Sequence, residues 1–276
     1  MSRTVDPELG AFVDARLAEL RAREPDIPFP QEEYDARLSK LRGRMEDAGI
    51  DTLLVSSPEG ACWLHGYRSR WNKMQSPTAW PPLQMTAVHA DSGRYIAFDT
   101  TEHEDLLRLT SVSRDNRLSV AEDMDGMLPF ILKELSAEGW LGGTVGIEKW
   151  SPVPNRAVSE AVEAELVAHG STIVDASALV REVRRIKSPR ELALVEEAVR
   201  ICDVGLRALA DFLKPGVTEL EAWAEMMRAM AAEGGEPAGI HECVVVGPAE
   251  LGHMFSSKRP IESGDYLFAD PCGVVY

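Results

Sequence analysis

A histidine and a carboxylate lie within the segment 247–276, GPAELGHMFSSKRPIESGDYLFADPCGVVY. Asp270 ends the apolar run DYLFAD, which follows a Gly264–Asp265 turn and has the length of a short strand. A carboxylate at the end of a strand sits on a rigid element, where it can bind a divalent cation or act as a general base. The same residue can also serve as a turn or cap residue before Pro271, and the spacing leaves both interpretations open.

His253 lies in the loop between the apolar runs CVVVG and DYLFAD, after a Gly-Pro turn. Imidazole titrates near neutral pH, so a histidine beside a carboxylate suits proton transfer. A lone loop histidine can also be merely solvated. The two residues together are more specific than either alone, and they predict a site at the end of the second run.

Two helices with clear start signals precede these strands. SPRE at 188–191 and TELE at 218–221 are capping boxes, each with a hydroxyl at the N-cap and a glutamate three residues later. The first helix is predicted to bury a single apolar stripe, which comprises Leu192, Val195, Val199, Cys202, Leu206 and Leu209.

The N-terminal part alternates helical and strand patterns, which predicts an α/β domain. After a polar helix in the first residues come a helix at 34–50, a strand at 51–57 and the strand- or turn-like ACWLHGY. MTAVHA and GRYIAFD read as strands joined by a tight turn at 91–93, followed by a helix, a strand, a helix and a strand up to about Val180. A basic segment then leads to Lys187, and we divide the chain into domains at 1–183 and 184–276.

Composition limits the function classes. The net charge of −16 and the pI of about 4.8 disfavour binding to nucleic acid and to acidic membrane surfaces, because both are negatively charged. No apolar run approaches the ~20 residues that span a bilayer, and the N-terminus lacks the apolar core of a secretory signal. The four cysteines are scattered without metal-binding spacing, which predicts reduced thiols and a cytoplasmic protein.

Three stretches resemble the pita-bread family, which includes creatinase, prolidase, Xaa-Pro aminopeptidase and methionine aminopeptidase. IKSPRELALVEEAVRICDVGLRALADFLKPGVTELEAWAEMM resembles the opening of its catalytic domain, and GPAELGHMFSSKRPIESGDYLFADPCGVVY resembles the next signature. YDARLSKLRGRMEDAGIDTLLVSSPEGACWLHGY is similar to the start of the creatinase/prolidase N-terminal domain. The resemblance implies an N-terminal creatinase/prolidase-like α/β domain followed by the first half of a pita-bread α+β domain.

The resemblance also implies roles for both candidate residues. Asp270 matches the first metal ligand of the metallopeptidase members, and His253 matches their substrate-facing histidine, which is the acid/base in creatinase. A full-length form would use a divalent metal (Mn, Co, Zn or Fe), whereas a creatinase-like protein would use none. The family further implies a homodimer that acts on a small peptide or amidic small molecule, with a segment around 68–80 covering the neighbour's site or simply packed on the surface.

Three functions therefore stay open. The first is hydrolysis of C–N bonds, like that of an aminopeptidase or Xaa-Pro dipeptidase, with a metal-activated water. The second is a metal-independent, creatinase-like hydrolase or lyase of a small substrate. The third is a truncated, non-catalytic binding module, because the later ligands of the family do not occur before Tyr276. On that third interpretation we expect the chain alone to hold no dinuclear metal and to hydrolyse no Xaa-Pro dipeptide.

Overall fold

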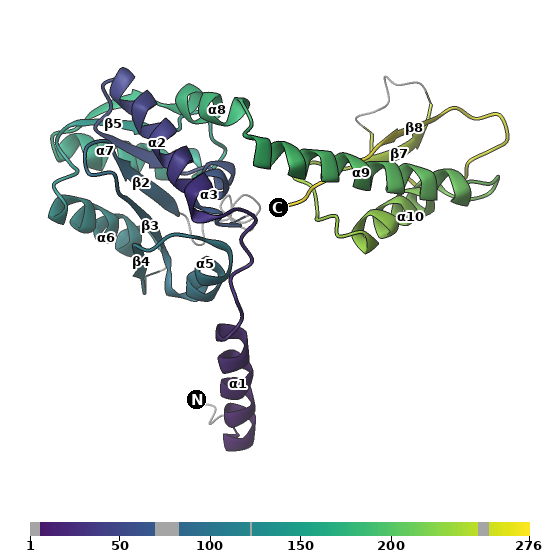
Figure 1. Cartoon of the computed structure of the whole chain (residues 1–276), viewed down its shortest axis with the longest axis horizontal. Coiled ribbons are helices and arrows are strands. Elements are labelled where there is room, and N and C mark those ends of the chain that lie inside the picture. The colour runs from purple at the N-terminus through teal and green to yellow at the C-terminus, as the bar shows by residue number, and fades with distance from the viewer. Residues whose placement is uncertain (1–5, 70–82, 122, 248–253) are drawn as a thin grey trace. The chain divides into compact units, whose positions relative to one another are not determined.

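The computed structural model describes residues 6–69, 83–121, 123–247 and 254–276 (Figure 1). The chain divides into two compact units, unit 1 at 1–186 and unit 2 at 187–276. None of the helices described there is long and apolar enough to cross a membrane. The predicted α/β class is confirmed for unit 1, where helices and strands alternate along the chain.

Unit 1 is built from the following elements in order: α1 Pro7–Arg21, α2 Gln31–Asp47, β1 Thr52–Val55, α3 Pro58–His65, β2 Met85–His89, β3 Tyr95–Thr100, η2 Thr101–His103, α5 Glu104–Thr110, β4 Asn116–Ser119, α6 Met124–Ala137, β5 Thr144–Ile147, α7 Arg156–Ala168, β6 Thr172–Asp175 and α8 Ser177–Arg185. The sheet order is β4-β3-β2-β1-β5-β6. β2 runs antiparallel to both of its neighbours, and the other pairings are parallel.

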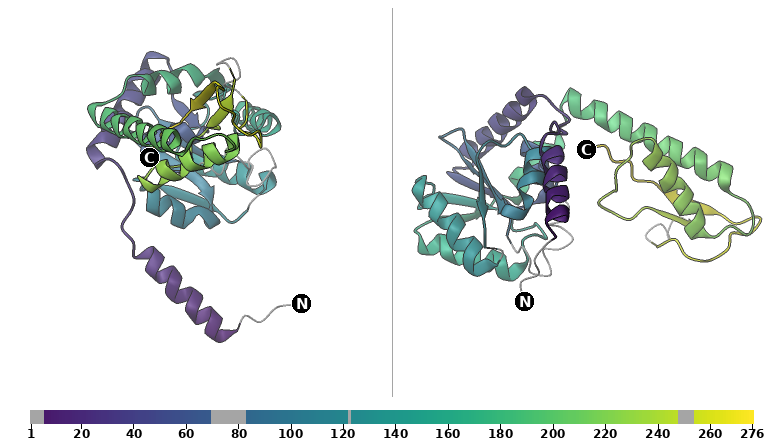
Figure 2. Two further views of the ribbon diagram at one scale, coloured as in Figure 1. Left: turned by 90° about the vertical axis from the view of Figure 1, so that its right-hand side faces the viewer. Right: turned by 90° about the horizontal axis from the view of Figure 1, so that it is seen from below.

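Helices cover both faces of this sheet (Figure 2). On one face, α6 and α7 pack against side chains such as Leu54, Phe98 and Ile147. On the other face, α2, α3 and α8 pack against Leu53 and Val55. Side chains alternate across a strand, so successive residues of β1 enter opposite cores and the whole strand is buried.

The prediction of a strand or turn for ACWLHGY is wrong in part, because the first residues of this segment lie in helix α3. Ser57 is the N-cap and its hydroxyl accepts a hydrogen bond from the backbone N–H of Gly60 at 3.1 Å. Pro58 occupies the first turn, and Gly66 ends the helix with a positive φ of 88°. A short apolar run does not by itself distinguish a strand from a buried helix, and here the caps decide.

Glu148 joins the ends of the two central parallel strands. It directly follows β5, and its carboxylate accepts hydrogen bonds from the backbone N–H groups of Ser56 and Ser57 at 2.7 Å each. The Ser57 hydroxyl donates a third bond at 2.8 Å. Burial raises the pKa of Glu148 overall, although these hydrogen bonds oppose the rise. The carboxylate therefore ties β5 to β1 and to the start of α3.

His65 is a fully buried, neutral histidine at the end of α3. Its ring nitrogens lie 2.8 Å from the Ser111 hydroxyl and 2.9 Å from the Thr86 hydroxyl, and its ring stacks on that of Tyr95. Burial lowers the pKa of His65 to about 3. The folded chain therefore keeps this imidazole uncharged through the pH range in which a solvated histidine takes up a proton.

Unit 2 consists of α9 Pro189–Phe212, α10 Glu219–Ala232, β7 Cys243–Val246 and β8 Leu267–Asp270. Both predicted capping boxes are confirmed, with Ser188 and Thr218 as the N-caps. β7 and β8 pair antiparallel, and α9 and α10 pack on one of their faces. Figure 1 shows this arrangement.

The predicted single apolar stripe of α9 is wrong in most of its positions. The buried residues of the helix are Ile201, Gly205 and Leu209. Gly205 faces α10, where an added Cβ would meet Met230 Cγ at 2.6 Å, so the missing side chain permits close helix packing. The exposed members of the stripe are Leu192, Val195, Val199 and Leu206. α9 thus has two apolar stripes, and spacing alone did not indicate which one α10 covers.

Glu219 holds together the segment that follows β7. Its carboxylate accepts hydrogen bonds from the backbone N–H groups of Val246, at 2.7 Å, and Ser257, at 2.9 Å. The Ser257 hydroxyl donates a further bond at 2.6 Å. Burial by itself would raise the pKa of Glu219, but the hydrogen bonds from Ser257 and Val246 outweigh it, so the pKa is lowered.

We predict that the burial of His65 makes the fold sensitive to mild acid. Below its ordinary pKa of 6.5 the unfolded chain binds a proton that the folded chain takes up only near pH 3. The free energy of unfolding should therefore fall by about 2 kcal/mol from about pH 7 to about pH 5. Urea unfolding should show this loss in the wild type and in His169→Gln, whose histidine is exposed, and not in His65→Gln. An equal loss in His65→Gln would assign the effect to other groups.

We also predict that Glu219→Gln destabilises unit 2 by about 1–3 kcal/mol, because buried N–H groups lose a charged acceptor. A lowered pKa means that the stabilisation is present above the unfolded pKa of the carboxyl and is lost as the pH falls through the folded one. Denaturant unfolding at neutral pH measures the effect, and Glu262→Gln, at an exposed glutamate, is the control. If both variants unfold at the same denaturant concentration as the wild type, the carboxylate does not hold the segment.

Candidate functional site

The pairing of β7 with β8 decides where Asp270 points. In the antiparallel register Cys243 lies opposite Asp270, and Val244 lies opposite Ala269. Directly opposed residues point to the same face of a sheet, and neighbours along a strand point to opposite faces. Val244 and Ala269 pack in the core with α9 and α10. Asp270 and Cys243 therefore point to the other face, which these two helices leave uncovered.

The Asp270 carboxylate differs from two other carboxylates of the chain, Glu148 after β5 and Glu219 at the start of α10. Glu148 and Glu219 each accept hydrogen bonds from two backbone N–H groups and one hydroxyl. Within the part of the chain that the structure describes, no residue donates a hydrogen bond to the carboxylate of Asp270, which is half-buried. A turn or cap residue is expected to accept such bonds. The geometry of Asp270 therefore favours a carboxylate that contacts a ligand over one that caps the backbone.

His253 lies outside the described residues, so its position relative to Asp270 stays a prediction. The structure does describe the residues on either side of the segment that carries it. Glu219 binds Val246 before the segment and Ser257 after it. Gly247 also donates a backbone hydrogen bond to the carbonyl of Tyr266, just before β8, at 2.8 Å. Both flanks of the segment are thus fixed to the strand pair that carries Asp270.

Two thiols lie near the same end of the strand pair. Burial raises the pKa of Cys243 and of Cys272, and the negative charge of Asp270 adds to both shifts. A nucleophilic cysteine needs a lowered pKa and a nearby cation or base. These cysteines have the opposite environment, which favours packed rather than catalytic thiols.

The described residues do not by themselves form a metal centre. No group of three or more histidine, cysteine, aspartate or glutamate side chains gathers in a metal-binding arrangement there. Asp270 offers one carboxylate, whereas protein-bound zinc takes at least three protein ligands and a dinuclear centre needs still more. The residues present fit one ligand of such a centre, and no reaction step through a metal follows from them.

Sequence reasoning did not identify Glu148 and Glu219 as organising residues. Glu219 lies within the capping box TELE, and Glu148 ends the short apolar run GTVGIE. For Glu148 the signal was the same as for Asp270, a carboxylate directly after a short apolar strand. What distinguishes the two is the set of hydrogen-bond donors around each carboxylate, which depends on residues distant in sequence.

Two family models match the chain. The creatinase/prolidase N-terminal domain matches residues 37–186, and metallopeptidase family M24 matches residues 193–276. Among curated proteins, the ectoine hydrolase of Halomonas elongata is 25% identical in an alignment of 275 positions that covers 90% of this chain and 64% of that protein. The uncharacterized peptidase YqhT of Bacillus subtilis is 31% identical over 237 residues, which are 85% of this chain and 60% of that protein.

Solved structures show the same fold. The Xaa-Pro dipeptidase from Bacillus anthracis superposes with a TM-score of 0.67 at 18% identity, over 87% of this chain and 61% of that chain. The prolidase from Pyrococcus furiosus gives 0.65 at 20% identity, over 84% and 64%. The chain spans less than two thirds of the length of these relatives. The match of the N-terminal domain model to residues 37–186, followed by the match to the M24 model, shows that the chain belongs to the creatinase/prolidase family.

Proposed function

We propose that this chain serves the hydrolysis of C–N bonds in small peptide or amidic substrates, with Asp270 as one ligand of a divalent metal. The observation that carries the proposal is the Asp270 carboxylate, which stands at a strand end on the face that α9 and α10 leave uncovered. It accepts no hydrogen bond from the described residues, and it lies within the region matched by metallopeptidase family M24.

The names of several relatives favour a peptide substrate. The probable dipeptidase PepE of Mycobacterium tuberculosis is 25% identical over 245 residues. Similar folds occur in proteins described as prolidases and Xaa-Pro dipeptidases. We therefore infer an Xaa-Pro dipeptide or a similar short peptide as the substrate class. His253 is the proposed group that transfers a proton at the substrate, since imidazole can do so near neutral pH.

A second candidate is a metal-independent reaction on a small amidic compound. Ectoine hydrolase matches 90% of this chain, and the creatinase of a Bacillus species matches 74% at 25% identity. In this candidate His253 is the acid/base and Asp270 is structural. The two candidates differ in one measurable property, the effect of a chelator on turnover.

A homodimer in the cytoplasm is the expected setting for either reaction. The homodimer is expected from the family. The cytoplasm is expected because all four cysteines are free thiols. Sedimentation equilibrium of the purified chain measures the assembly state, and a monomer across the accessible concentration range would contradict the dimer.

We predict that Asp270→Asn weakens Mn(II) binding by at least about tenfold, because the hard cation loses a negatively charged oxygen ligand. Isothermal titration with Mn(II) measures this, and Asp211→Asn, at an exposed aspartate of α9, is the matched control. Equal Mn(II) affinity in the wild type and in Asp270→Asn would contradict a metal-binding role for Asp270 and favour a role as a turn residue.

We predict that any turnover of alanyl-proline by the chain is stimulated by Mn(II), abolished by EDTA and abolished by Asp270→Asn. Release of free proline is the readout, with Asp211→Asn again as the control. Turnover that survives both EDTA and Asp270→Asn but is lost in His253→Ala would replace the metal-dependent proposal with the creatinase-like one.

A further inference from the structure

The sheet of unit 1 contains a topological switch point between β1 and β5. The two strands are parallel neighbours, with Leu54 beside Ile147. The helix after β1, α3, packs on one face of the sheet, whereas the helix after β5, α7, packs on the other. The two connections leave the strand ends in opposite directions and open a crevice there, which is where open α/β sheets bind their ligands.

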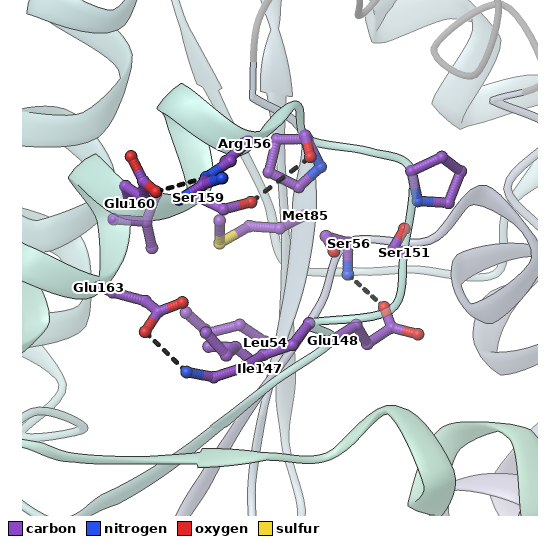
Figure 3. A pocket seen from close by; sticks show the side chains of 14 residues that line it. Leu54, Ser56, Met85, Ile147, Glu148, Ser151, Arg156, Ser159, Glu160 and Glu163 are labelled. Carbon is purple, nitrogen blue, oxygen red and sulfur yellow. Dashed lines mark hydrogen bonds and ion pairs between the residues drawn. The ribbon is translucent and has the colours of Figure 1, made fainter.

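A cavity of about 480 Å³ lies at this point, next to the carboxyl ends of β1 and β5 and the first turns of α7 (Figure 3). A volume of this size is within the range of small-molecule sites, roughly 300–1,000 Å³. All of its lining residues belong to unit 1. The cavity lies in a different unit from Asp270, and its use does not depend on the function proposed above.

The floor of the cavity is aliphatic. Leu54, Met85, Ile147 and Val162 line it from the sheet and from α7. Figure 3 shows Met85 and the Leu54–Ile147 pair between the charged side chains of α7 and the opposite wall with Ser56, Ser151 and Glu148. An apolar floor of this kind accommodates an aliphatic side chain of a ligand.

Besides Glu148, the wall and rim of the cavity carry two basic and two acidic side chains, which form two ion pairs. Glu148 is already bound by Ser56 and Ser57. Lys149 pairs with Glu163 at 2.8 Å, and Arg156 pairs with Glu160 at 2.6 Å. The Lys149–Glu163 pair is partly exposed and the Arg156–Glu160 pair largely exposed, so each contributes little to stability and can open when a ligand offers a better partner.

We propose that this cavity binds a small zwitterion with an aliphatic side chain, namely a free α-amino acid. Lys149 would bind the ligand carboxylate, Glu163 would bind its ammonium group, and the aliphatic floor would receive its side chain. A ligand with both charges satisfies each member of an opened ion pair. A purely anionic ligand would leave Glu163 unpaired beside it, and a purely cationic ligand would leave Lys149 unpaired, and either arrangement is costly.

The test is the binding of L-leucine to the whole chain by isothermal titration, with amide chemical shifts to locate the site. Two analogues separate the charges: 4-methylpentanoate lacks the ammonium group, and leucinamide lacks the carboxylate. We expect saturable binding of leucine at millimolar concentrations or below, with both analogues at least about tenfold weaker. Shifts should concentrate at the ends of β1 and β5 and at the start of α7.

Matched variants assign the two charged groups. Lys149→Gln and Glu163→Gln should each weaken leucine binding by roughly tenfold, and each should preserve the overall fold because both side chains are partly exposed. The controls are Lys133→Gln and Glu165→Gln, which alter exposed residues on α6 and α7 outside the cavity lining and should bind leucine as the wild type does.

Three results would each overturn the proposal: no saturable binding of leucine, equal affinity for leucine and 4-methylpentanoate, or the same affinity in Glu163→Gln as in Glu165→Gln. The readout is binding in unit 1 and involves no turnover. A failure here therefore leaves the function proposed for Asp270 untouched, and loss of metal binding in Asp270→Asn does not affect this test.

Discussion

The carboxylate of Glu148 is the constraint on which the centre of unit 1 depends. It crosses from the end of β5 to the backbone N–H groups of Ser56 and Ser57, at the point where β1 turns into α3. Burial raises the pKa of Glu148 more than the hydrogen bonds from Ser57 and Ser56 lower it. With the two strand ends held together, α3 and α7 depart to opposite faces, and the crevice between them follows from that topology.

Unit 2 uses the same kind of contact for a different segment. Glu219 at the start of α10 binds the backbone on both sides of the stretch that includes His253. Here the hydrogen bonds outweigh burial and the pKa of the carboxyl is lowered, so the ionised form is favoured. A helix start, a strand end and a loop are joined by one side chain, on the strand pair that carries Asp270.

Three carboxylates thus lie at a strand end or contact one, and their surroundings give them different roles. Glu148 and Glu219 are surrounded by donors and act within the fold. The carboxylate of Asp270 accepts no hydrogen bond from the described residues and points away from α9 and α10. The same chemical group is structural in one setting and available for a ligand in another, because backbone N–H groups satisfy it in the first and not in the second.

Local signals in the sequence determined the fold class, both capping boxes, the hairpin of β2 and β3 and the short strands around the candidate site, because caps, turns and apolar runs act over a few neighbouring residues. They also singled out Asp270 as a strand-end carboxylate. The caps of α3, Ser57 and Gly66, are local signals as well, although the apolar run ACWLHGY alone did not distinguish the helix from a strand. Tertiary structure alone decided that Gly205 rather than Leu206 of α9 faces α10. It also decided that the carboxylates of Glu148 and Glu219 accept hydrogen bonds, whereas no described residue donates one to the carboxylate of Asp270. Each of these outcomes depends on a residue tens of positions away in the chain. A local sequence pattern does not specify which distant residues come into contact.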